Sequence, residues 1–311
     1  MTVTVKTEVK MELFAPKYYK NFQCIADKCQ HSCCVGWEID IDDYTLELYR
    51  DIPGEIGETI RGSIGESEES AYFRMCPDGK CPHLDERALC RIIKALGDDA
   101  LCDICREHPR FYNDVGDHSE VGLGAVCEEA ARLILSEEDY ATLEYVGEAY
   151  GDPGTDAFDP TVLRAELFAI LSDATIPYSQ RLEMIADKYL AAELPDDSSV
   201  GNLLSTLEYL DESHRNLFED ICSTHLPEGE TALFCERFFA YLIYRHGGAA
   251  TDAESFCRAV GFALILERLF RSLIYKHGFT PAESARIISE ELEYSEENTE
   301  NIQLSVDTAA Q

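Results

Sequence analysis

The chain is 311 residues long, 45% of them hydrophobic, and its 26 Lys and Arg face 60 Asp and Glu, which gives a net charge of −34. So much negative charge repels polyphosphates and excludes general nucleic-acid binding, since no basic patch offsets it. The hydrophobic fraction argues against a disordered chain, and no apolar run approaches the ~18–20 residues of a membrane span. We expect one large domain or two smaller ones around a real core.

Residues 1–12 are expected to form an N-terminal extension. They alternate polar and apolar residues and lack the apolar stretch of a signal peptide. The protein is therefore predicted to be cytoplasmic, in a compartment where thiols are kept reduced.

The next segment, residues 13–137, is rich in cysteine. Ten of the thirteen cysteines fall between Cys24 and Cys127. In a reducing compartment clustered cysteines indicate a metal site, with redox-active disulfides as the alternative. The other three lie in apolar helical patterns and are predicted to be ordinary buried residues: Cys222, Cys235 and Cys257.

The densest block contains Cys24, Cys29, Cys33 and Cys34, separated by four, three and no residues. Such spacing lets one loop turn several thiolates toward a common centre. The side chains of adjacent residues diverge, so Cys33 and Cys34 are poorly placed to chelate one ion together. The block therefore predicts more than one metal position, or a polynuclear cluster that takes thiolates from several segments.

A second group of cysteines follows: Cys76, Cys81, Cys90, Cys102, Cys105 and Cys127. Gly97-Asp98-Asp99 has the pattern of a helix start, so Cys102 and Cys105 are expected on one helix face. Thiolates suit both zinc and iron–sulfur clusters. Four histidines of the region are available to complete zinc sites: His31, His83, His108 and His118. The spacing matches neither zinc fingers nor two-cluster ferredoxins.

Five short stretches accompany these cysteines: Leu13–Lys20, Val35–Asp40, Cys81–Leu84, Ala100–Phe111 and Gly122–Gly124. Together they resemble the flagellin lysine-N-methylase family, which is related to the CxxCxxCC cysteine-cluster proteins. The likeness covers residues 13–136 and is loose afterwards. The spacing of the first block is wider here than in that label, and Cys76 is an additional cysteine.

The resemblance implies a methyltransferase that uses S-adenosylmethionine to modify lysines of flagellin before export. It also implies a four-iron four-sulfur cluster, with zinc as the alternative metal. Carried over by position, the metal-binding thiolates are Cys24, Cys29, Cys33, Cys34, Cys81, Cys90, Cys102, Cys105 and Cys127.

Three aromatic residues flank the first block: Tyr18, Tyr19 and Trp37. They are candidates for holding the sulfonium of the methyl donor by cation–π contact, and packing around a metal loop is the alternative. The glycine-rich turn of the common methyltransferase fold is missing, because Gly122-Leu-Gly124 lacks the required spacing. The pattern identifies no catalytic residue.

Past Glu137 the pattern is helical almost throughout, and the turn Gly151–Gly154 precedes most of this helical region, residues 138–295. Apolar residues at spacings of three and four predict helices over Thr161–Ser172, Tyr178–Leu190, Val200–Asp211, Glu212–Ser223, Glu230–His246, Asp252–Lys276 and Pro281–Leu292. Residues 296–311 are expected to be an acidic flexible tail. The predicted fold is mainly α: a cysteine-rich, metal-held N-terminal region with little regular structure between short helices, followed by a helical bundle.

Two other functions remain open on these patterns. One is a metal-cluster protein with a redox or sensing role and no enzymatic activity. The other is a zinc-stabilised helical interaction module. Iron–sulfur protein is brown and zinc–thiolate protein colourless, and methyl transfer to flagellin separates the enzyme from both alternatives. The oligomeric state does not follow from the sequence.

Overall fold

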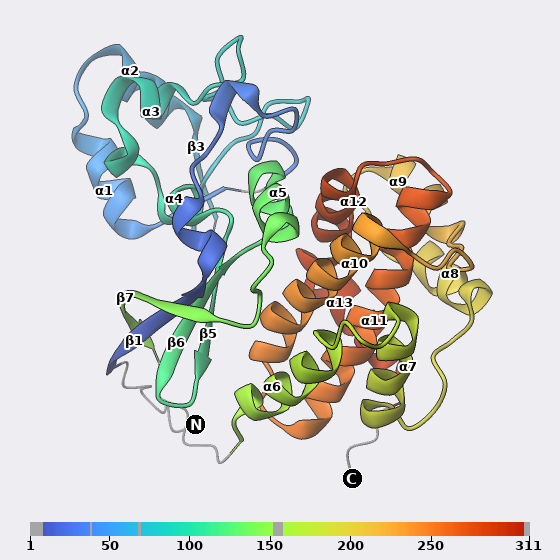
Figure 1. Ribbon diagram of the computed structural model, residues 1–311. Helices are drawn as coiled ribbons and strands as arrows, with labels where there is room; N and C mark the ends of the chain where they lie inside the picture. The colour runs from blue at the N-terminus through green and yellow to red at the C-terminus, as the bar shows by residue number, and fades with distance from the viewer. Residues whose placement is uncertain (1–8, 38, 68–69, 152–157, 308–311) are drawn as a thin grey trace, which may run out of the picture. The chain divides into compact units, whose positions relative to one another are not determined.

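The computed structural model describes residues 9–37, 39–67, 70–151 and 158–307 (Figure 1). The chain divides into two compact units. Residues 23–110 form one, here called the cysteine unit, and residues 1–22 together with 111–311 form the other, the helical unit. Helices predominate, as predicted, and a β-sheet accompanies them in each unit. The units part at residues 22 and 110, whereas the pattern of the sequence had placed a division at residue 137.

The helical unit contains a four-stranded sheet that was not expected from the sequence pattern. Its strands lie in the order β5 (Arg110–Val115), β6 (His118–Leu123), β1 (Val9–Pro16) and β7 (Leu143–Gly151). β1 runs parallel to β6 and antiparallel to β7, so that Leu13 pairs with Ser119 on one side and Gly147 on the other. Residues 9–12, expected to be an extension, thus belong to an inner strand. Their polar–apolar alternation is the period of a strand.

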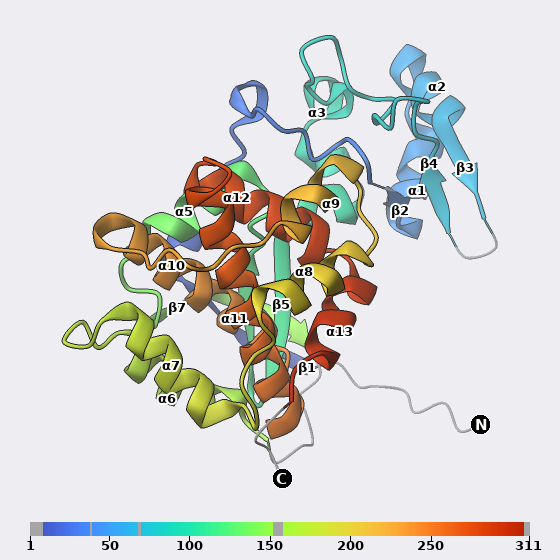
Figure 2. The ribbon, with the colours of Figure 1, turned by 90° about the vertical axis from the view of Figure 1, so that its right-hand side faces the viewer.

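Seven helices of this unit correspond to the predicted ranges, and the largest difference is a helix over Asp197–Ser205 where Val200–Asp211 was predicted. The helices of the unit are α5 (Glu128–Ser136), α6 (Pro160–Leu171), α7 (Tyr178–Tyr189), α8 (Asp197–Ser205), α9 (Glu212–Glu219), α10 (Gly229–Leu242), α11 (Ala253–Tyr275), α12 (Pro281–Ile288) and α13 (Glu296–Leu304). α11 is buried along most of its length and contacts α7, α10, α12 and α13, as the central helix of a bundle does (Figure 2). α13 lies where a flexible tail was expected, and it buries Ile302.

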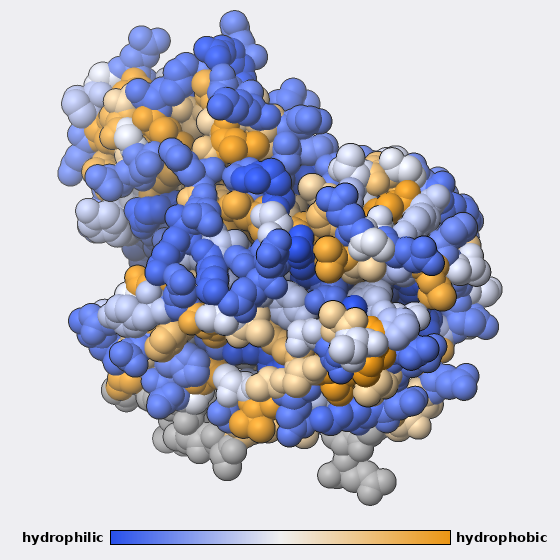
Figure 3. Space-filling view, viewed as in Figure 1, coloured by the Kyte–Doolittle hydropathy of each residue, from blue (hydrophilic) through white to orange (hydrophobic). Residues whose placement is uncertain are grey.

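The surface agrees with the high net charge. Hydrophilic side chains cover most of the face shown in Figure 3, and apolar groups appear there in small patches. In the described part of the chain, no helix has both the length and the apolar character to cross a membrane.

A buried ion pair connects the sheet of the helical unit to its helices. Arg164 of α6 donates two hydrogen bonds to the carboxylate of Glu120 on β6, over 2.7 and 2.5 Å. The side chain of Glu120 is fully buried, and that of Arg164 is 8% exposed. The guanidinium of Arg164 also lies over the ring of Tyr244, 5.2 Å from its centroid. Because both charges are shielded from water, each is stabilised mainly by the other.

Gly122, on the inner strand β6, lies where no side chain fits. A Cβ atom at this position would come within 2.3 Å of the ring of Phe111 and 2.9 Å of that of Tyr244. We therefore expect Gly122→Ala to lower the free energy of unfolding by about 1–3 kcal/mol, since both rings must move. Chemical denaturation measures the effect. Gly62→Ala is the control, because nothing lies within 4 Å of that Cβ; equal losses in both variants would contradict this packing argument.

A second polar network joins α9 to the C-terminal helices. Nδ1 of His214 lies 2.6 Å from Oε1 of the fully buried Glu291. The same carboxylate accepts hydrogen bonds from the backbone N–H groups of Leu210 and Asp211. Although burial opposes it, hydrogen bonding to Glu291 raises the pKa of His214, and the charges of Asp211 and Glu290 add to this.

This network makes the stability of the helical unit depend on pH. A histidine whose pKa is raised in the folded state stabilises fully below its ordinary pKa of 6.5, and the contribution is lost as the pH rises through the raised value. We expect His214→Gln to flatten this part of the pH dependence. Urea unfolding at a series of pH values on both sides of 6.5 measures it, and an unchanged slope in the variant would refute the assignment to His214.

The cysteine unit combines short helices with a small antiparallel sheet. Its elements are α1 (Asp43–Asp51), α2 (Gly54–Ser63), α3 (Arg91–Leu96), α4 (Asp103–Glu107) and the strands β2 (Asp40–Ile41), β3 (Ile64–Glu66) and β4 (Ala71–Phe73). The strands lie in the order β2-β4-β3. A core of its own forms around Tyr49, Ile60, Phe73 and Ile92. The buried thiols of Cys81 and Cys102 belong to this core, so the sulfur-bearing loops are part of the packing.

Candidate metal centre

The structure distributes the nine predicted metal-binding thiols over both units. Eight belong to the cysteine unit, whereas Cys127 precedes α5 in the helical unit as its N-cap. Of the three cysteines predicted to be buried, Cys235 and Cys257 are buried and Cys222 is only partly so. Cys222 lies just after α9, where its N–H donates to the hydroxyl of Ser272. Its position in a loop explains the difference.

Six thiols of the cysteine unit have pKa values shifted by burial and by neighbouring thiols: Cys33, Cys34, Cys81, Cys90, Cys102 and Cys105. We call them the six-thiol group. A seventh cysteine, Cys76, adds to the rise in the pKa of Cys81. The thiol of Cys34 is hydrogen-bonded to the sulfur of Cys33, and the thiol of Cys105 to that of Cys102. The group takes its members from four separate stretches of chain.

Backbone pairing holds the first two stretches together. Val35 and Lys80 form an isolated β-bridge, and the N–H of Cys81 donates to the carbonyl of Cys34 over 2.8 Å. Gly36 and Gly79, hydrogen-bonded to each other over 2.9 Å, both have positive φ. Glycine adopts this left-handed conformation without strain, so the two loops can turn tightly beside the sulfurs.

Helix α4 positions the other pair, though not as the sequence indicated. The helix begins after Cys102, which is its N-cap, and not at Asp98. Cys105 lies in the first turn, and its N–H donates to the carbonyl of Cys102 over 3.0 Å. Asp42 fixes the start of this helix, since its carboxylate accepts from the N–H of Asp103 as well as from that of Thr45. The two sulfurs meet because a cap and a first turn are adjacent, not because they share a helix face.

Burial and mutual repulsion keep most of these thiols protonated. Burial raises the pKa of Cys81 to about 11 and also raises that of Cys90. Within each hydrogen-bonded pair one thiol is favoured as thiolate: the hydrogen bond from Cys34 lowers the pKa of Cys33 to about 7. Several thiolates here require a compensating positive charge, which a metal centre supplies. The donor set therefore fits a thiolate-bound metal.

The four cysteines of the first block lie in different surroundings. Cys33 and Cys34 belong to the six-thiol group, but Cys24 is exposed, and the thiol of Cys29 donates to the carbonyl of His31 over 2.6 Å.

The three aromatic candidates for donor binding lie in different surroundings. Tyr18 is buried in the core of the helical unit, and Tyr19 packs against the same core. Trp37 is half-buried in the cysteine unit. Their role in holding the donor stays a prediction.

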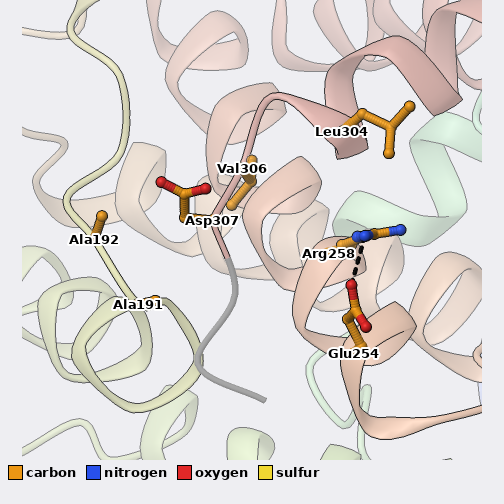
Figure 4. Close-up of a pocket in the computed structure, with 7 residues that line it drawn as sticks. All are labelled: Ala191, Ala192, Glu254, Arg258, Leu304, Val306 and Asp307. Atoms are coloured by element: carbon orange, nitrogen blue, oxygen red, sulfur yellow. Dashed lines mark hydrogen bonds and ion pairs between the residues drawn. The ribbon is translucent and has the colours of Figure 1, made fainter. Parts of the chain in front are cut away.

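The other candidate sites in the described residues are weaker. An open cavity of about 450 Å³ in the helical unit is lined by Ala191, Ala192, Glu254, Arg258, Leu304, Val306 and Asp307, with Arg258 paired to Glu254 (Figure 4). It offers neither a sulfur nor a nitrogen ligand. Among the described residues, one group of three side chains brings possible metal-ligand atoms within 4.8 Å of one another: His214, Glu290 and Glu291. Its oxygens already accept hydrogen bonds from the backbone and from Arg286.

Known proteins similar to this chain include enzymes that act on lysine. It is 30% identical over 134 residues to the lysine-N-methylases of Salmonella choleraesuis (strain SC-B67) and Salmonella typhimurium, a match to 41% of this chain and 33% of each relative. It is also 30% identical over 134 residues to the flagellar biosynthetic protein FliU of Salmonella muenchen, of which the match covers 79%. The chain belongs to the flagellin lysine-N-methylase family.

Membership of this family confirms the resemblance drawn from the cysteine-rich segment. The matched region spans about a third of the length of the two lysine-N-methylases. No family model matches the chain, and no solved structure is similar to it.

Proposed function

We propose that the chain is a protein-lysine N-methyltransferase that uses S-adenosylmethionine and acts on flagellin. The observation that carries this proposal is the identity shared with two proteins named lysine-N-methylase and with a flagellar protein. The net charge of −34 supports it, because an acidic surface attracts both a sulfonium donor and a lysine-bearing substrate. We expect modification to take place in the cytoplasm, before flagellin is exported.

We further propose that the six-thiol group binds a four-iron four-sulfur cluster. In a tetrahedral zinc site all sulfurs lie about 2.3 Å from one ion, and so within about 4 Å of one another. No three cysteines of the described residues bring their sulfurs within 4.8 Å of one another. Thiolates that each bind a different iron of a cluster can remain farther apart, so this arrangement favours the cluster over zinc. When bound, the cluster supplies the positive charge that compensates the thiolates.

The methyl-transfer step needs a neutral lysine amine, since the ammonium has no lone pair. The site must therefore desolvate the amine or supply a base, and must hold amine and sulfonium in line.

The test is a methylation assay under anaerobic conditions. The purified chain is incubated with flagellin and S-adenosylmethionine labelled in its methyl group, after iron, zinc and acid-labile sulfide have been measured. We expect label on lysines of flagellin, and iron and sulfide in the protein. Iron and sulfide without methyl transfer would favour the redox or sensing protein, and zinc without sulfide would refute the cluster.

A further inference from the structure

One histidine of the cysteine unit is fully buried, although no role has been assigned to it so far. His83 is 0% exposed and follows Cys81 by two residues. Its ring packs edge-on against that of Phe73, with the centroids 4.7 Å apart. A polar side chain so fully removed from water is costly unless its nitrogen atoms have partners.

Hydrogen bonding determines which ring nitrogen of His83 carries the proton. The hydroxyl of Ser63 donates to the carbonyl of Ile60 over 2.7 Å, so it has only lone pairs left for other partners. Nε2 of His83 lies 2.8 Å from this oxygen and must therefore be the N–H donor. A neutral ring with its proton on Nε2 carries a bare lone pair on Nδ1.

Nδ1 is the atom left without a partner. It is buried and makes no hydrogen bond among the described residues. Leaving such an acceptor unsatisfied costs about 1–3 kcal/mol. A bridging water needs two or more polar partners, and the neighbouring Phe73 ring offers none. A cation that accepts the lone pair removes the cost.

The backbone on both sides of His83 is tied to the six-thiol group. The N–H of His83 is hydrogen-bonded to the sulfur of Cys81. Its carbonyl accepts from the N–H of Arg91 over 2.8 Å, and the next residue, Leu84, forms a β-bridge with Cys90. His83 is thus held between two members of the group by the same contacts that position their sulfurs.

We propose that Nδ1 of His83 is a nitrogen ligand of the metal centre bound by the six-thiol group, and that Ser63 orients its ring. This inference rests on the proposed cysteine-bound centre. A hydrogen bond from the second ring nitrogen is the usual device that fixes the tautomer of a metal-bound histidine. Neutral imidazole ligates iron–sulfur clusters as well as zinc, and at a cluster it raises the reduction potential.

The decisive experiment uses the wild-type chain, purified anaerobically and reduced, with and without ¹⁵N-labelled histidine. Pulsed electron paramagnetic resonance of the cluster should show a strongly coupled nitrogen whose signal changes with the label. If the bound metal is zinc, X-ray absorption at the zinc edge should show nitrogen beside sulfur in its coordination shell. A centre with sulfur ligands alone would overturn the role of His83 and leave the six-thiol group intact.

Variants separate ligation from packing. We expect His83→Ala to lower the metal affinity by roughly tenfold or more, since loss of a residue that only orients a ligand already lowers it by about 10–100-fold. Added imidazole should restore it by entering the space left by the ring. Phe73→Leu is the matched control, because it disturbs the packing of His83 but keeps the nitrogen; Ser63→Ala should weaken metal binding less than His83→Ala.

The outcomes distinguish this inference from the proposal on which it rests. Equal metal loss in Phe73→Leu and His83→Ala, with no rescue by imidazole, would show that the ring only packs. Wild-type chain that contains no metal would overturn both the cysteine-bound centre and its histidine ligand. Metal with a coupled nitrogen but no methyl transfer would support His83 as ligand and contradict the enzymatic function alone.

Discussion

We expect the variant Cys34→Ser to lose most of its bound metal, so that the metal content per chain falls at least about tenfold. The thiol of Cys34 is hydrogen-bonded to that of Cys33 and interacts electrostatically with Cys81 and Cys90. A serine hydroxyl is not deprotonated at neutral pH and binds soft metals poorly. Because metal binding is coupled to the folding of such small units, the cysteine unit should also become more sensitive to proteolysis.

The matched control for this experiment is Cys222→Ser. This cysteine lies in the helical unit and takes no part in the six-thiol group. Metal and sulfide content after anaerobic purification, with the absorption spectrum, measure both variants. If Cys34→Ser retains as much metal as Cys222→Ser, the six-thiol group is not the metal centre.

Removal of the buried guanidinium in Arg164→Ala is expected to cost about 3–5 kcal/mol of stability, because the buried carboxylate of Glu120 loses both guanidinium hydrogen bonds and keeps the longer, 3.4 Å contact with Nε2 of His118. Hydrogen bonding to His118 and Arg164 lowers the pKa of Glu120 despite its burial, so the group is charged at neutral pH. Chemical denaturation of the variant measures the loss.

The exposed pair of Lys188 and Glu166 is the control for this second prediction. Their side chains are 42% and 51% exposed. Water and salt screen such a pair, so Lys188→Ala should cost less than about 1 kcal/mol. A further variant, Glu120→Gln combined with Arg164→Met, should recover part of the loss, since it leaves no unpaired charge. An Arg164→Ala loss as small as that of Lys188→Ala would contradict the dependence of Glu120 on its partner.

The second half of the chain was largely predictable because helices are local. The periods of three and four that predicted Asp252–Lys276 and Pro281–Leu292 involve residues within one turn of each other, and α11 and α12 start within a residue of those ranges. The strands were missed for the opposite reason. β1 pairs with β6 and β7, which lie more than a hundred residues further along the chain, and short patterns do not reveal such partners.

The sequence by itself determined the family, and it predicted the ligand chemistry of the proposed centre. Thiolate is the only ligand that ten clustered cysteines can offer in quantity, whatever the fold. Only the tertiary structure decided which cysteines are neighbours in space, because that depends on loops closed by distant hydrogen bonds such as that from Cys81 to Cys34. It also separated His83 and His108, each of which has a buried ring nitrogen without a partner among the described residues, from His118, whose two ring nitrogens lie beside carboxylates. Such contacts are a property of the surrounding side chains, and no pattern of neighbours along the chain encodes them.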